Sequence, residues 1–123
     1  MITGLGIDIV ETKRIKKDLD DFGERFVKRI LGADEIDLLQ NRKDREQFLA
    51  GRFAAKEAAI KAMGKYLKDK PPFYHIQILR DTHGMPQLVF NEDITHKLAG
   101  LNSHVSISHE KNYAVAIVIL EEP

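Results

Sequence analysis

The sequence predicts an α+β domain in which a mostly antiparallel sheet packs on one long helix. Residues 51–64 contain no proline and are rich in alanine, the strongest helix former. Stretches that alternate apolar and polar residues, as strands do, lie near both ends of the chain. Turn residues separate two pairs of the predicted strands, which favours hairpins. We expect one domain over residues 1–123, because this length supports a single modest core.

The first predicted strand covers residues 2–10. Its two faces differ, with Leu5, Ile7 and Ile9 on one side and Gly4, Gly6 and Asp8 on the other. Glycines weaken a strand, so their presence suggests that something approaches the second face closely. Asp8 either caps the following helix or serves a site on this bare face, and the pattern does not separate the two alternatives.

Helical patterns fill the region between this strand and the long helix. Residues 11–31 are predicted to be helical with an interruption near Gly23, and they are rich in lysine and arginine. Such a run is either a solvated face or a docking surface for an acidic partner. Asp34 is expected to cap a short helix that ends at Gln40, and residues 41–46 form a polar connection.

The long helix carries two charged stripes. Glu57 and Lys61 share one stripe, and Arg52 and Lys56 share another. An exposed Glu–Lys pair four residues apart would be worth only a few tenths of a kcal/mol. A single solvated face should carry one polar stripe, however, so we expect that some of these charges have buried partners.

The second half of the chain reads as two hairpins joined by a short helix that Asn91 caps. The predicted strands are residues 73–80, 87–90, 103–109 and 113–120. The last is a continuous apolar run, typical of a strand buried on both faces. His104 lies on a serine-rich strand face, where it either binds phosphate or is simply a polar surface residue.

Composition excludes several functional classes. The chain has 19 basic and 19 acidic residues, so no overall charge favours nucleic acid or a membrane surface. It has no cysteine, which excludes disulfides and thiol catalysis, and no apolar run of membrane-spanning length. We expect a cytoplasmic protein.

Three segments together resemble a known family. They are residues 6–11 (Gly-Ile-Asp-Ile-Val-Glu), 51–61 (Gly-Arg-Phe-Ala-Ala-Lys-Glu-Ala-Ala-Ile-Lys) and 104–109 (His-Val-Ser-Ile-Ser-His). In this order and spacing they resemble the holo-[acyl-carrier-protein] synthases, the small bacterial type of 4′-phosphopantetheinyl transferase. The turn with Asp81, Gly84 and Pro86 also matches. Lys65 and Tyr66 depart from the pattern, since the family is usually glycine-rich after Gly64.

The resemblance implies an activity and partners. Such an enzyme transfers 4′-phosphopantetheine from coenzyme A to a serine of apo acyl carrier protein and releases 3′,5′-ADP, in the service of fatty acid biosynthesis. It implies Mg²⁺ as cofactor and a homotrimer with active sites at the subunit interfaces. Arg14, Arg25 and Arg29 stand where the family carries basic residues, so the basic helical segment is expected to dock the acidic carrier.

The expected site residues follow from the matching motifs. Asp8 and Glu57 would hold Mg²⁺, which prefers one or two carboxylates plus substrate phosphates. Glu57 would also take the proton of the serine hydroxyl, and Lys61 would contact the pyrophosphate. Glu35 is a weaker acidic candidate. Arg52 and His104 are the expected ligands of the remaining phosphate. Pro86 is expected to border the adenine.

Two other functions stay open at the level of sequence. A catalytically silent module could dock acidic helical partners through the basic segment, although it would not need Asp8, Glu57 and Lys61. A Mg²⁺-dependent nucleotide phosphohydrolase could use the same carboxylates.

Overall fold

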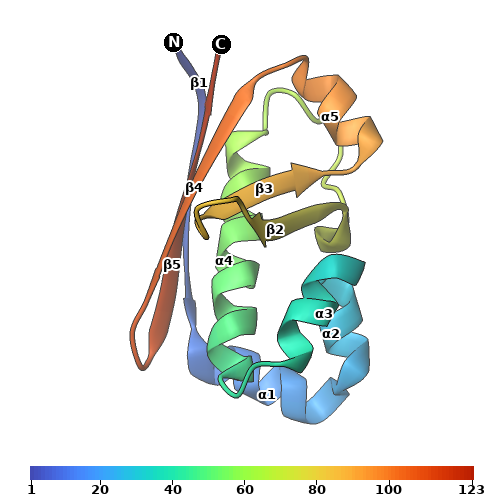
Figure 1. Ribbon diagram of the computed structural model, residues 1–123, viewed down its shortest axis with the longest axis vertical. Helices are drawn as coiled ribbons and strands as arrows, with labels where there is room; N and C mark the ends of the chain where they lie inside the picture. Colours follow the sequence, from blue (N-terminus) through green and yellow to red (C-terminus); the bar gives the residue numbers. More distant parts are fainter.

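A computed structural model describes residues 1–123 and places one long helix between a three-stranded sheet and a layer of shorter elements (Figure 1). The elements in chain order are β1 (Ile2–Glu11), α1 (Thr12–Phe22), α2 (Glu24–Ile30), α3 (Ala33–Gln40), α4 (Arg45–Ala62), the 3₁₀ turn η1 (Phe73–His75), β2 (Ile76–Arg80), β3 (Pro86–Phe90), α5 (Glu92–Leu98), β4 (Asn102–His109) and β5 (Tyr113–Glu121). The predicted α+β class with antiparallel strands is confirmed, but the strands form two sheets rather than one.

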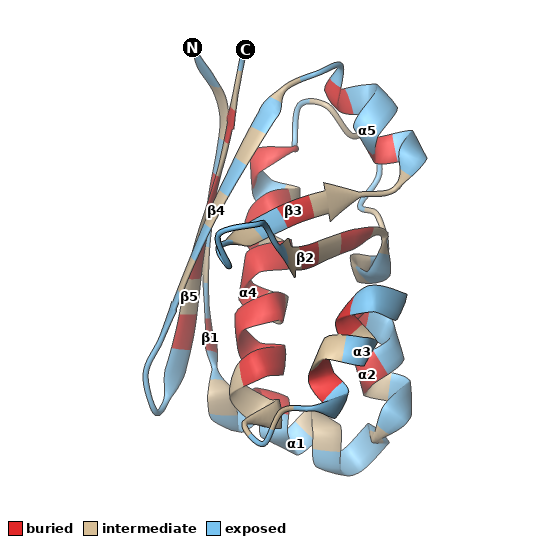
Figure 2. Cartoon of the chain, viewed as in Figure 1, coloured by how far each residue is buried: buried red, intermediate tan, exposed pale blue.

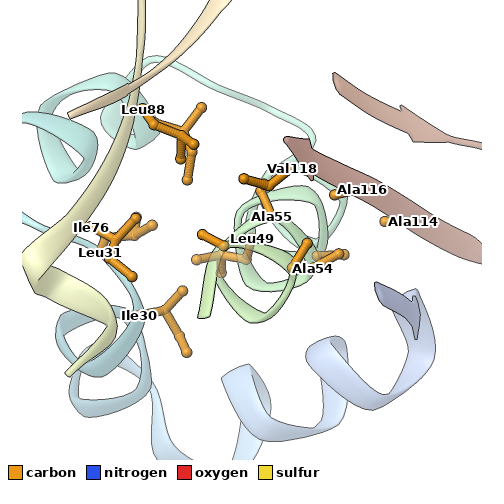
Figure 3. Close-up of a cluster of buried hydrophobic side chains, with 14 of the residues drawn as sticks. Ile30, Leu31, Leu49, Ala54, Ala55, Ile76, Leu88, Ala114, Ala116 and Val118 are labelled. Carbon is orange, nitrogen blue, oxygen red and sulfur yellow. The ribbon is translucent and has the colours of Figure 1, made fainter. Parts of the chain in front are cut away.

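The larger sheet has the strand order β1-β5-β4, with both pairs antiparallel. Alternate residues of β5 from Ala114 to Leu120 are buried on the face that α4 covers, as Figure 3 shows for Ala114, Ala116 and Val118. Residues of β5 on the other face, such as Ile117, stay partly exposed. The expectation that this strand is buried on both faces is therefore wrong for the single chain.

Helix α4 approaches β1 more closely than side chains would allow. A Cβ atom added to Gly6 would lie 1.9 Å from the carbonyl oxygen of Ala58, and one added to Gly4 would lie 2.2 Å from that of Ala62. The expected close approach to the glycine face is confirmed, and the approaching segment is the backbone of α4. Alanines on α4 complete the fit, because a larger side chain would hold the helix away from the strand.

The core surrounds α4, which is buried along most of its length (Figure 2). On the side away from the larger sheet it meets the β2–β3 hairpin and α1 to α3, so that Leu49 lies near Ile76 and Leu31 (Figure 3). The helix begins at Arg45, inside the stretch expected to be a polar connection. No helix is long and apolar enough to cross a membrane.

Candidate functional site

The seam between β1 and α4 brings two of the expected site residues together. Lys61 Nζ lies 3.2 Å from Asp8 Oδ1 and donates a hydrogen bond of 2.8 Å to the carbonyl oxygen of Ile7. Asp8 does not cap α1, which begins at Thr12 without a side-chain cap. The capping alternative is therefore wrong, and Asp8 faces α4 from the strand face that the glycines clear.

Glu57 lies one turn before Lys61 on α4 but does not pair with it. Its Oε1 lies 3.0 Å from Nζ of Lys70, in the segment between α4 and η1. Gly4 stands against Ala62 and Gly6 against Ala58. Two residues of strand advance about as far as one turn of helix, so Asp8 lies level with the turn of α4 that contains Glu57.

The carboxylates of Asp8, on β1, and Glu57, on α4, are the two expected metal ligands. No group of three or more histidine, cysteine, aspartate or glutamate side chains could hold an ion. The Asp8 and Glu57 side chains are 18% and 23% exposed, so both can still reach a ligand from solvent. Two accessible carboxylates fit Mg²⁺ that is bound together with substrate phosphates, but not a closed site made of protein alone.

Glu57 also lines a groove of about 600 Å³ between α1, α2, α4 and η1. Aromatic rings form one wall, where Phe53 and Phe73 meet edge to face with centroids 5.3 Å apart. Arg14 and Arg29 line the same groove, and the Arg14 guanidinium lies 5.4 Å from the centroid of Phe53. The basic helices therefore border directly on the candidate catalytic carboxylate.

A second pocket, of about 180 Å³, holds two of the three residues expected to bind the nucleotide end. Arg52 and Pro86 line it together with Arg42, Arg80 and His109, whereas His104 lies elsewhere. His104 is on the outer face of the sheet, with its Nε2 2.7 Å from Oε1 of Glu121.

Sequence reasoning missed His109, although the alternation of β4 contained the signal. His104 shares its face of the strand with Ser106 and Ser108. His109 is an odd number of residues from His104, so it lies on the opposite face together with Ile107, toward the pocket.

The second charged stripe of α4 is buried and finds its partner in Glu35. The Lys56 and Glu35 side chains are fully buried, and Arg52 is 10% exposed. The expectation of buried partners is confirmed for this stripe. Glu35 cannot touch a bound substrate from the core, so its role as an acidic site residue is wrong.

Comparison with known proteins identifies the family. A model of the 4′-phosphopantetheinyl transferase superfamily matches residues 4–118. The chain belongs to this superfamily. Within it, this phosphopantetheinyl transferase groups with the holo-[acyl-carrier-protein] synthases. It is 43% identical to the synthase of Shewanella denitrificans, over 98% of each chain, and 41% identical to that of Koribacter versatilis, over 99% of this chain and all of the other.

Solved structures of this group share the fold of the transferase described above. The synthase of Bacillus anthracis in complex with CoA (3′,5′-ADP) is 40% identical, with a TM-score of 0.83 over 100% of this chain and 99% of that one. The synthase of Neisseria meningitidis is 34% identical, with a TM-score of 0.90 over 99% of this chain and 100% of that one.

Proposed function

We propose that this chain transfers 4′-phosphopantetheine from coenzyme A to a serine of apo acyl carrier protein, with release of 3′,5′-ADP. The reaction is proposed to require Mg²⁺, to serve fatty acid biosynthesis in the cytoplasm, and to use residues 1–123 as one transferase domain. The observation that carries this proposal is the contact of Lys61 with Asp8 across the seam of β1 and α4, with Glu57 one turn earlier on α4, where it lines the groove. The similarity to holo-[acyl-carrier-protein] synthases supports it as well.

Three residues carry the chemistry in this proposal. Asp8 and Glu57 hold Mg²⁺ together with the pyrophosphate, and Lys61 contacts the same phosphates. When bound, Mg²⁺ supplies positive charge that stabilises the transferred phosphoryl group. Glu57 takes the proton of the attacking serine hydroxyl, directly or through a water, which its place in the groove supports.

The second pocket is proposed to hold the nucleotide end of coenzyme A. Arg52 binds the 3′-phosphate, His109 adds a second donor, and Pro86 borders the adenine. The cluster of guanidinium groups supports this assignment, because arginine matches phosphate geometry. His104 stays a predicted phosphate ligand, and in the single chain its partner is Glu121.

We further propose a homotrimer in which the two halves of the site come from neighbouring subunits. On the outer face of the larger sheet the residues of β1 are apolar, and Leu5, Ile7 and Ile9 are 61%, 60% and 64% exposed there. A contiguous apolar face of this kind marks an interaction site. Light scattering should report three times 14.0 kDa for the parent and a smaller species for Ile7→Glu. A monomeric parent at micromolar concentration would contradict the assembly.

The activity is tested by mass spectrometry of the carrier. The protein is incubated with coenzyme A, Mg²⁺ and an apo carrier protein, with Glu57→Gln as the matched control. A carrier heavier by one phosphopantetheine supports transfer. An unchanged carrier with cleaved coenzyme A would instead favour a phosphohydrolase, and no change in either molecule would favour a silent docking module.

A further inference from the structure

Glu35 is a buried carboxylate that accepts from three different segments. Its Oε1 accepts hydrogen bonds from Lys56 Nζ at 2.6 Å and from the Gly32 amide at 3.0 Å. Its Oε2 accepts from the Ile78 amide at 2.9 Å and lies 3.8 Å from Arg52 Nε. The carboxylate therefore joins α3 to α4 and to the free edge of β2.

Arg52 is held against the same residue of β2. Its Nη2 donates a hydrogen bond of 2.9 Å to the carbonyl oxygen of Ile78, and its guanidinium lies 4.0 Å from the ring centroid of Phe48. This is the only hydrogen bond that the Arg52 side chain makes. Its Nε is buried on the side of Glu35, so the donors left for a ligand in the pocket are those of the two terminal nitrogens that Ile78 does not use. Ile78 thus meets Glu35 through its amide and Arg52 through its carbonyl.

Glu35 stabilises the charged form of Arg52. Burial, with repulsion from Arg80 and Arg42, lowers the pKa of Arg52 to about 10, and the Glu35 carboxylate opposes this shift. Arg42 is already neutralised by Asp44, with Nη2 and Oδ2 2.8 Å apart. Glu35 is therefore the negative charge that compensates the guanidinium on its buried side.

We propose that Glu35 is a positioning residue for phosphate recognition, which holds the Arg52 guanidinium against the β2–β3 hairpin so that the pocket selects coenzyme A over dephospho-coenzyme A. This proposal rests on the assignment of the second pocket to the 3′-phosphate. Glu35 itself never touches the ligand. Its loss should weaken recognition of that one phosphate and leave the phosphoryl transfer at Asp8, Lys61 and Glu57 largely intact.

The test compares the affinities of coenzyme A and dephospho-coenzyme A by titration calorimetry with Mg²⁺ on the assembled protein. We expect the parent to prefer coenzyme A by tenfold or more, and Arg52→Gln to lose this preference. Glu35→Gln should reduce it at least threefold, with a raised KM for coenzyme A and a kcat changed by less than about twofold. Ile94→Val, a buried substitution on α5, is the matched control and should keep the parental preference.

The outcomes separate the positioning role from the assignment of the pocket. A folded Glu35→Gln that keeps the parental preference overturns the positioning role alone. A parent without any preference overturns both. If Glu35→Gln fails to fold, the double variant Glu35→Gln/Lys56→Met takes its place. It also removes the positive charge of Lys56, which Glu35→Gln alone would leave buried without a partner, and buried ion pairs can be replaced by uncharged groups. A reduced preference in that double variant supports the proposal, and a parental one overturns it.

Discussion

Replacement of Gly6 by alanine should force β1 and α4 apart, although it adds only one methyl group. The new Cβ would lie 1.9 Å from the carbonyl oxygen of Ala58 and 2.9 Å from the amide nitrogen of Ala62. Real Cβ atoms essentially never approach other atoms within 3.0 Å, so the seam must open by at least the difference of 1.1 Å. The obstacle is helix backbone, which cannot rotate away as a side chain can.

The cost follows from the packing that this opening disturbs. Adding a methyl group to a tightly packed core typically costs about 1–3 kcal/mol. A gap of about 1 Å also removes up to about half of the dispersion energy of the atoms that line it. We therefore expect Gly6→Ala to lower the free energy of unfolding by about 3 kcal/mol or more. Transfer activity should fall too, because Asp8 moves with the strand.

Urea denaturation followed by circular dichroism measures this loss, at one protein concentration because association shifts stability. Gly51→Ala is the matched control. Its Cβ would lie 3.2 Å from Cγ2 of Ile107, a side-chain atom that can shift, and alanine favours a helix over glycine by about 1 kcal/mol. We expect that control to stay within about 1 kcal/mol of the parent. Gly6→Ala with parental stability would refute the reasoning.

Three further predictions concern the charges. Asp8→Asn and Glu57→Gln should stay folded but lose on the order of a hundredfold or more in transfer rate, and near-parental turnover at saturating Mg²⁺ would contradict the metal assignment. Reversal of Arg14 and Arg25 to Glu should slow carrier association, measured by stopped flow at several salt concentrations, while binding of coenzyme A without carrier stays unchanged. Burial lowers the pKa of Lys56 from 10.5 to about 8 in the fold. Between about pH 8 and pH 10.5 the unfolded chain therefore binds more protons at Lys56 than the folded one. The free energy of unfolding should rise by up to about 3 kcal/mol as the pH increases across this range, and Lys56→Met should lack the corresponding rise in the urea midpoint.

Local patterns in the sequence were enough to predict most elements and the faces on which their residues lie. The alanine-rich stretch predicted the helical core of α4, and the alternation in residues 2–10 separated Ile7 and Ile9 from Gly6 and Asp8. These signals are local, because the period of a helix or a strand is set by its own backbone geometry. The matching motifs, likewise contiguous in sequence, indicated the family and named Asp8, Glu57 and Lys61 as site candidates.

Only the tertiary structure decided which charges meet. Lys61 has Asp8 as its partner, 53 residues away, and Glu57 has Lys70, rather than each other. Glu35 was an acidic site candidate in the sequence, yet the packing of α3 and β2 on α4 buries it completely. Periodicity states which residues share a face, but the segment that covers this face comes from a distant part of the chain. Burial and ion pairing depend on that covering segment, so the pairs that form the site and the core cluster appear only once the chain is folded.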